Sequence, residues 1–358
     1  MAGEELEKYG AQAQEAFDII FSPVPALVLK SALLLEIPDI IARQGSNASL
    51  SLHEIAARLP TQNPHLDYLS RILRYLSKKG IFIQSGVGGE ARYALSDISK
   101  HFFVKEKNPF SLVPTAMLET SEVSMARWHH LHECVLQGCN AFEKAHGKSI
   151  YACGKDNPDF NNVLNDYMAA HTMTAIGQIV NHYQGFKDLK SLVDVGGGNG
   201  TALREILKVY PHIRGINFDL PHVVAAAPEI PGIEHVGGSM FESVPSGTDA
   251  IFIKKVLLDW DDTSCMKILE NCHKALPENG KLILIEEAVP DLLEKSAWID
   301  ILYMARMTEI INRSEEDWSK MVQDSGFSIL KIEWLPGMFA KMLIIEATKS
   351  ISNGNKVG

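Results

Sequence analysis

The feature that most limits how this chain can fold is the run LVDVGGGNG at residues 192–200. Its apolar start predicts a buried β-strand, and its glycines at 196, 198 and 200 predict a tight turn that opens a helix. Glycine lets a ligand approach the backbone closely, and amide groups at a helix N-terminus can point at that ligand. The run therefore predicts a strand, a turn and a helix that together border a ligand site.

The spacing of these glycines narrows the kind of ligand. A dinucleotide-binding turn of the GxGxxG type would need another glycine at position 201, where the chain has Thr201. The observed spacing suits a nucleoside cofactor without a pyrophosphate, such as S-adenosylmethionine. Some glycine-rich turns merely connect a strand to a helix, so this prediction needs a second feature to support it.

Asp219 supplies that second feature. It ends the apolar run GINFD, about 20 residues after the glycine turn, where an acidic side chain can accept hydrogen bonds from both ribose hydroxyls. The alternative is that Asp219 only caps a helix that begins near Pro221. Together with the glycine turn, Asp219 favours the ribose role.

The second half of the chain alternates between short apolar runs and helical stretches. The predicted strands are residues 191–195, 214–219, 234–236, 250–253 and 281–286, and helices are expected at 202–209 and 264–276. This alternation predicts a parallel, doubly wound α/β sheet. Two last runs, 327–334 and 342–347, flank Pro336 and Gly337 and predict an antiparallel hairpin at one edge.

The first hundred residues predict helices followed by a small hairpin, which is a winged-helix pattern. Ser51 and Glu54 form a capping-box sequence, and residues 66–79 carry one apolar stripe that ends before Gly80. Such a module can bind DNA or serve as a structural or dimerisation unit. Residues 17–41 are apolar almost all round, which favours a partner surface and a dimer.

Net charge and cysteine usage limit the partners. The chain has 34 basic and 44 acidic residues, a net charge of −10, which disfavours binding to nucleic acid or an anionic membrane. Its five cysteines include no CxxC pair, so neither a disulfide framework nor a metal site is expected. The start MAGEELEKYG lacks the features of a signal peptide, and we expect a cytoplasmic protein.

Several ordered motifs resemble those of plant small-molecule O-methyltransferases of the caffeic acid and alkaloid type: LVDVGGGNG, GINFDLPHVV, GGSMFESVP, IKKVLLDWDD and CHKALPENGKLILIEE. The resemblance spans residues 10–348. It implies an α/β protein with an N-terminal helical winged-helix dimerisation domain at 1–108, followed by a helical linker and a Rossmann-like methyltransferase domain at 109–358. It also implies S-adenosylmethionine, a small aromatic substrate and a homodimer, with a heterodimer with a related subunit as the alternative.

The resemblance also implies a cofactor site. Its members are Gly196, Gly198, Asp219, Leu220, Ser239, Met240, Phe241, Lys254 and Trp260. Trp260 matches a tryptophan beside the adenine. Ser239 departs from the family pattern Gly-Asp-Met-Phe and removes a carboxylate that would receive the adenine amino group.

The catalytic positions depart further from the family pattern. The family motif is Lys-Trp-x-x-His-Asp-Trp, and this chain has Leu258 where the general base should stand. Of the two carboxylates that orient that histidine, Glu286 is present, and the other position holds Asn312. We interpret Asp259 and Glu286 as candidates to replace the missing base.

These observations favour S-adenosylmethionine-dependent methylation of a phenolic plant metabolite of phenylpropanoid or alkaloid type. Because Leu258 removes the base, alternatives remain open. The chain could methylate an amine, which needs little help from a base, or could catalyse a cyclisation or isomerisation without methyl transfer. It could also be a catalytically weak partner subunit.

Overall fold

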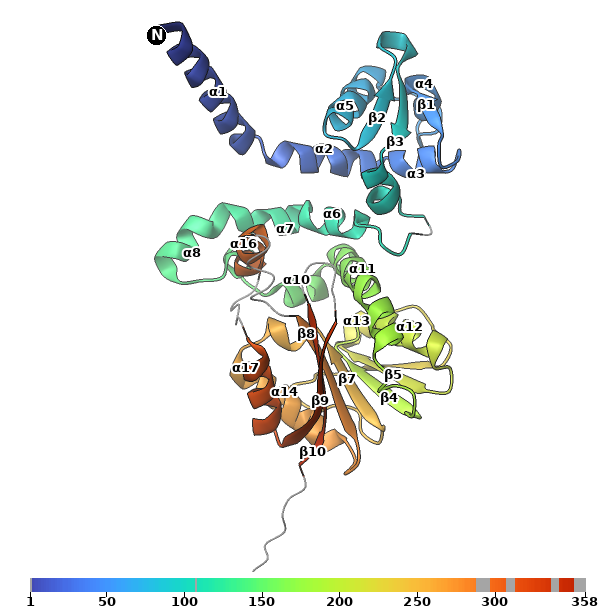
Figure 1. The fold of residues 1–358 in the computed structure, drawn as a ribbon, viewed down its shortest axis with the longest axis vertical. Helices are drawn as coiled ribbons and strands as arrows, with labels where there is room; N and C mark the ends of the chain where they lie inside the picture. The colour runs from blue at the N-terminus through green and yellow to red at the C-terminus, as the bar shows by residue number, and fades with distance from the viewer. Residues whose placement is uncertain (1, 107, 288–296, 307–312, 336–340, 351–358) are drawn as a thin grey trace, which may run out of the picture. The chain divides into compact units, whose positions relative to one another are not determined.

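The computed structural model describes residues 2–106, 108–287, 297–306, 313–335 and 341–350. The chain forms two compact units, Met1–Ser121 and Glu122–Gly358 (Figure 1). This division lies later in the chain than the boundary after residue 108 that the sequence suggests.

The N-terminal unit consists of short helices around a small sheet. Its α-helices are α1 (Ala2–Ile20), α2 (Pro23–Leu34), α3 (Ile37–Ala42), α4 (Leu52–Ala56), α5 (Leu66–Lys78) and α6 (Val113–Glu119). Its strands are β1 (Ser49–Ser51), β2 (Phe82–Ser85) and β3 (Arg92–Leu95), which pair antiparallel in the order β1-β3-β2. This arrangement of helices and a short hairpin is the expected winged helix.

Local sequence signals explain these helices. The Ser51 hydroxyl accepts a hydrogen bond from the Glu54 amide at 3.2 Å, and the Glu54 carboxylate accepts one from the Ser51 amide at 2.7 Å, which confirms the capping box. Along α5 the apolar stripe of Leu69, Leu73 and Leu76 is buried. The unit therefore has a hydrophobic core of its own.

Large apolar side chains are exposed on α1 (Phe17, Ile19 and Ile20), in the turn that follows it (Phe21), and on α2 (Leu27 and Leu34). No single helix in the described ranges is long and apolar enough to cross a membrane, while Lys8–Ile20 with Pro23–Leu34, bent by 48°, meets the length and composition test as a pair.

The C-terminal unit is built on one seven-stranded sheet. Its strands are β4 (Ser191–Val195), β5 (Arg214–Asp219), β6 (Ile233–Gly237), β7 (Ala250–Lys254), β8 (Lys281–Glu287), β9 (Phe327–Leu335) and β10 (Met342–Lys349). They lie in the order β6-β5-β4-β7-β8-β10-β9. The first five are parallel, and β10 pairs antiparallel with both β8 and β9. The doubly wound sheet and its antiparallel hairpin are confirmed. Strand β10 lies inside the sheet and β9 forms the edge, while the turn expected at Pro336 and Gly337 falls outside the described residues.

Helices cover both faces of this sheet (Figure 1). The α-helices of the unit are α7 (Glu122–Ala126), α8 (Leu131–Gln137), α9 (Ala141–His146), α10 (Ile150–Asp156), α11 (Pro158–His182), α12 (Thr201–Val209), α13 (Pro221–Ala225), α14 (Asp262–Ala275), α16 (Ala297–Arg306) and α17 (Glu315–Asp324). Because side chains alternate along a strand, Val193 packs with α14 and α17, and Leu192 packs with α11 and α12. The buried sheet holds the carboxyl ends of β4, β5 and β7 rigidly at one edge.

Candidate active site

A cavity of about 260 Å³ opens at the carboxyl ends of β4, β5 and β7. This edge of a parallel sheet is where doubly wound folds bind ligands. The cavity brings together most of the residues expected at the site: Gly196, Gly198, Asp219, Leu220, Ser239, Met240, Phe241, Lys254, Leu258, Asp259 and Trp260. Two expected residues, Glu286 and Asn312, are absent from this lining; Asn312 lies outside the described residues.

The glycine turn borders the cavity in a backbone conformation that residues with a side chain rarely adopt. Gly196, Gly198 and Gly200 have φ angles of +72°, +59° and +82°. A Cβ atom on Gly196 would lie 2.7 Å from Cγ2 of Val256, so the turn also packs closely against the segment after β7. The requirement for glycine is therefore both conformational and steric.

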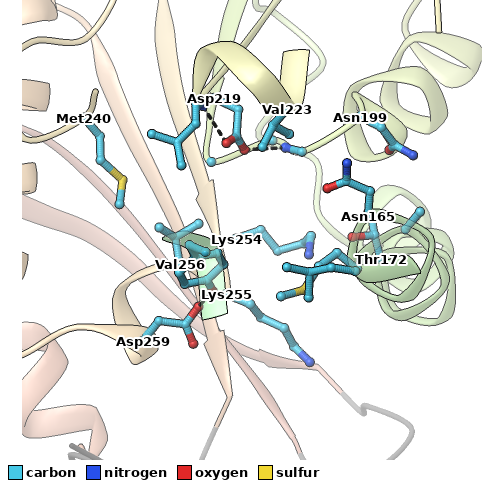
Figure 2. A pocket seen from close by; sticks show the side chains of 18 of the residues that line it. Asn165, Thr172, Asn199, Asp219, Val223, Met240, Lys254, Lys255, Val256 and Asp259 are labelled. Carbon is cyan, nitrogen blue, oxygen red and sulfur yellow. Dashed lines mark hydrogen bonds between the residues drawn. The ribbon is translucent and has the colours of Figure 1, made fainter. Parts of the chain in front are cut away.

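Asp219 is held at the end of β5 by two backbone amides (Figure 2). Its Oδ2 accepts a hydrogen bond from the Gly198 amide at 2.8 Å, and its Oδ1 accepts one from the Leu220 amide at 2.6 Å. Helix α13 has no side-chain cap, so the capping alternative for Asp219 is wrong. Each carboxylate oxygen has two lone pairs, so Asp219 can still accept from a ribose diol. Burial raises the pKa of Asp219 above its usual value.

Phe241 and Trp260 form an aromatic wall of the cavity near Met240. The rings of Phe241 and Trp260 meet edge to face with centroids 4.8 Å apart, and the Asn271 amide nitrogen donates to the Met240 carbonyl at 2.9 Å. Ser239 also lines the cavity and offers a hydroxyl where a carboxylate was expected from the resemblance. A flat base can pack against this wall, which together with Asp219 and the glycine turn fits a nucleoside.

Lys254 ends strand β7 at the cavity, and Lys255 directly follows it. Lys254 points from the strand end toward α11, where Asn165 and Thr172 lie (Figure 2), and Lys255 also lines the cavity. Lys255 has a φ of +54°, and its amide donates to the Ile285 carbonyl at 2.8 Å. Lys255 was not identified as a site residue from the sequence. The family motif has tryptophan at this position, and that departure could have pointed to it.

The segment after Val256 brings Leu258 and Asp259 to the cavity on the 3-10 turn η4 (Leu257–Asp259). Asp259 accepts a hydrogen bond from the hydroxyl of Tyr151 on α10. Burial raises the pKa of Asp259 to about 6. The Asp259 side chain is not a helix cap, because Asp261 caps α14 by accepting from the Ser264 amide at 2.6 Å.

Glu286 lies behind the cavity wall at the end of β8 and is fully buried. Its Oε1 accepts from the Leu257 amide at 3.0 Å, and its Oε2 has no hydrogen-bond partner among the residues that the structure describes. Burial raises the pKa of Glu286 to about 8. With leucine at position 258, no imidazole can reach this carboxyl from that position.

Three further lining residues were missed or given little weight: Tyr167, His171 and Arg306. Arg306 donates to the Tyr167 hydroxyl at 3.0 Å and lies over its ring. Burial, and after it the charge of Lys255, lowers the pKa of His171 to about 3, which makes that imidazole a weak base at neutral pH. His129 and His130, on the 3-10 turn η3 (Arg127–His130), do not line the cavity.

The comparisons with known proteins agree with this geometry. Residues 17–105 match an O-methyltransferase dimerisation domain and residues 128–328 an O-methyltransferase domain. Caffeic acid 3-O-methyltransferase of Catharanthus roseus is 39% identical over 325 residues, covering 87% of this chain and 89% of that protein. Esculetin O-methyltransferase of Kitagawia praeruptora is 39% identical over 326 residues, covering 87% and 88%.

Solved structures share the fold. The crystal structure of LaPhzM has a TM-score of 0.77 at 27% identity and covers 95% of this chain and 99% of its own. Human N-acetylserotonin methyltransferase in complex with S-adenosylmethionine has a TM-score of 0.78 at 18% identity, covering 95% and 98%. The family matches and the fold confirm the resemblance, the cofactor and the dimeric organisation. This chain belongs to the S-adenosylmethionine-dependent O-methyltransferase family, with a dimerisation domain ahead of its methyltransferase domain.

Proposed function

We propose that the protein methylates a phenolic oxygen of a small planar phenylpropanoid or coumarin. The observation that carries this proposal is that one cavity is lined both by the glycine turn with Asp219 and by Asp259, which directly precedes Trp260 of the aromatic wall. The relatives named for caffeic acid and esculetin support acceptors of this size and planarity.

The cofactor half of the site is assigned from these contacts. Asp219 would hold the ribose hydroxyls, the turn at Gly196 and Gly198 would lie against the nucleoside, and Leu220 would pack beside it. Met240, Phe241 and Trp260 would cover the adenine, with Ser239 and Lys254 at the polar rim. When bound, S-adenosylmethionine supplies a methyl group made electrophilic by its positively charged sulfur.

The acceptor half must make a phenol nucleophilic. A phenol with a pKa of about 10 is mostly protonated at neutral pH, and a general base typically accelerates such a reaction by about 10²- to 10⁴-fold. Leu258 cannot take a proton, and Glu286 is outside the cavity. Asp259 is the carboxylate at the wall, and with a pKa of about 6 it is ionised above that pH. We therefore assign to Asp259 the role of accepting the proton of the phenol.

The experiment is incubation of the purified protein with methyl-labelled S-adenosylmethionine and a panel of catechols, hydroxycoumarins and aromatic amines. Methylated phenols are the expected products, and cofactor binding is measured in parallel by calorimetry. Cofactor binding with no methylated phenol would contradict the proposed activity.

A second candidate rests on the leucine at position 258 and the buried carboxyl of Glu286 behind it. An amine acceptor already carries a lone pair when neutral, so N-methylation would need no base at that position. The amines in the panel test this reading. A cyclisation or isomerisation would convert the acceptor without incorporating the labelled methyl group. A weak partner subunit would gain activity on mixing with a related enzyme.

For assembly we propose a homodimer formed through the N-terminal unit. The dimerisation-domain match and the exposed apolar side chains of Phe17, Ile20 and Phe21 support it. A heterodimer with a related subunit would use the same surface. The cytoplasmic location expected from the sequence stays a proposal, as does the absence of nucleic-acid and membrane partners.

A further inference from the structure

We infer that Tyr151 is the positioning residue that holds Asp259 as the proton acceptor, in place of the histidine missing at position 258. This inference rests on the proposed O-methylation. Tyr151 and Asp259 are 108 positions apart in the chain, and both line the cavity. The Tyr151 hydroxyl donates to Oδ2 of Asp259, so the carboxylate keeps lone pairs, including those of Oδ1, for an acceptor hydroxyl.

Aromatic packing fixes the position of the Tyr151 hydroxyl. The ring of Tyr151 lies nearly parallel to that of Trp260, at 19° with centroids 6.2 Å apart, and Trp260 in turn packs edge to face on Phe241. The Trp260 carbonyl accepts a hydrogen bond from Arg313 Nη2 at 2.7 Å. The tyrosine is therefore packed beside a turn that is itself anchored, which is the support that a positioned carboxylate requires.

Burial and three neighbouring groups act on the pKa of Asp259. Tyr151 on α10, Arg306 on α16 and Lys255 after β7 lower its pKa. The charge of Asp259 in turn raises the pKa of Glu286 on β8. Burial outweighs these contributions and raises the pKa of Asp259 to about 6. Removing the Tyr151 hydroxyl removes one contribution that favours the ionised carboxylate, so the pKa of Asp259 should rise further.

Tyr151 itself stays protonated. Burial and, after it, the negative charge of Asp259 raise the pKa of Tyr151 well above its usual value. The hydroxyl therefore remains a donor throughout the pH range in which Asp259 is ionised. This separates the two roles: Asp259 exchanges the proton, and Tyr151 orients the carboxylate without titrating.

The proton and electron balance is simple. The acceptor O–H bond breaks and its proton passes to the Asp259 carboxylate, while the oxygen electron pair forms the new O–CH₃ bond. The electron pair of the broken S–CH₃ bond stays on sulfur, which becomes a neutral thioether. Asp259 then releases its proton to water before the next cycle, so no further reactant is needed.

The test is the pH profile of kcat/KM for one methylated phenol. In the wild type we expect an acid limb near pH 6, where Asp259 becomes ionised. Tyr151→Phe should move that limb upward by about one pH unit, so that activity falls about tenfold below pH 6 and recovers much of the loss at pH 9. Asp259→Asn should remove the limb and most of the activity.

Tyr183→Phe is the matched control. Tyr183 donates to Glu346 at 2.6 Å in a tyrosine–carboxylate pair that does not line the cavity. This variant should lower the thermal midpoint and leave the acid limb in place. If Tyr151→Phe fails to fold, 3-fluorotyrosine at position 151 keeps the ring and strengthens the donor, and it should move the limb to lower pH.

The outcomes separate the two proposals. A wild-type protein that methylates no phenol overturns the proposed function and this inference with it. A wild type that methylates phenols, with an acid limb that neither Tyr151→Phe nor 3-fluorotyrosine moves, overturns the inference alone. A uniform loss across all pH values in Tyr151→Phe would indicate a structural role and would also overturn it.

Discussion

The buried carboxyl group of Glu286 accepts a hydrogen bond from the backbone amide of Leu257 at 3.0 Å, directly before the leucine that stands at the family's base position. The carboxyl that would orient a histidine is thus retained, while the residue it would orient is not. Several variants follow from this relationship and from the geometry of the cofactor pocket.

Restoring the histidine should raise phenol methylation. Leu258→His places an imidazole beside the Glu286 carboxyl, and we expect a gain of about tenfold or more in kcat/KM. The gain should be largest above pH 8, because the pKa of Glu286 is raised to about 8 and the carboxylate orients the ring best when ionised. The measurement is the pH profile of both proteins on one phenol.

The family pattern puts a second carboxylate at position 312, so Leu258→His with Asn312→Glu should exceed the product of the separate effects. If Leu258→His instead slows a fast wild type, the leucine shapes the pocket for other chemistry.

Asp219→Ala should weaken S-adenosylmethionine binding, because the carboxylate is already held by the amides of Gly198 and Leu220 and can accept from the ribose. The expected loss is about 1.5–3 kcal/mol of binding free energy, typical of hydrogen bonds to a charged group. Calorimetry gives the value. Asp188→Ala, at an exposed position away from the cavity, should bind as the wild type does. If the wild type, Asp219→Ala and Asp188→Ala bound S-adenosylmethionine with equal affinity, Asp219 would not be part of the cofactor site.

Gly197→Ala should destabilise the glycine turn. The new Cβ would lie 2.1 Å from Oδ1 of Asn217 and 2.7 Å from Oδ2 of Asp194, and such overpacking costs about 1–3 kcal/mol of folding free energy. Gly198→Ala is the comparison, since its Cβ meets nothing within 4 Å and only the φ of +59° opposes it. Urea denaturation should rank Gly197→Ala as the less stable variant; the reverse order would show that steric contact does not dominate.

Glu286→Gln should stabilise the protein at alkaline pH. The pKa of Glu286 rises from 4.5 to about 8 on burial, so the folded state holds a proton that the unfolded state loses, and this contribution to stability falls between those values as pH increases. Glutamine keeps the acceptor for the Leu257 amide without the ionisable group. Because each unit of pKa difference corresponds to about 1.4 kcal/mol, we expect a gain on the order of 4 kcal/mol at pH 8 and little at pH 4.5. Urea denaturation at both pH values checks this, with Glu229→Gln, at an exposed position, as control.

Charging the apolar surface of the N-terminal unit should dissociate the dimer. Phe17 and Ile20 are exposed on α1, and Phe17→Asp with Ile20→Asp would place two unpaired charges in a partner interface. Sedimentation should show the variant as a monomer at concentrations where the wild type is dimeric. Val87→Asp, on the equally exposed wing between β2 and β3, should stay dimeric.

Local signals accounted for most of the fold. The glycine turn, the capping box at Ser51 and the alternation of strands and helices each depend on residues close together in the chain, and the structure has these elements nearly where they were expected. The insertion of β10 between β8 and β9 was not predicted, because strand order depends on which apolar faces pack together across the whole sheet.

The sequence by itself determined the family, the cofactor and the loss of the histidine at position 258, because each depends on short motifs of residues that are close together in the chain. Only the tertiary structure decided that Glu286 lies behind the cavity wall and that Tyr151 meets Asp259. Contacts between residues 108 positions apart depend on how α10 packs beside the turn after β7, and no local pattern encodes that packing. Burial, which changes the pKa of both carboxyl groups, likewise exists only once the sheet and its helices have assembled.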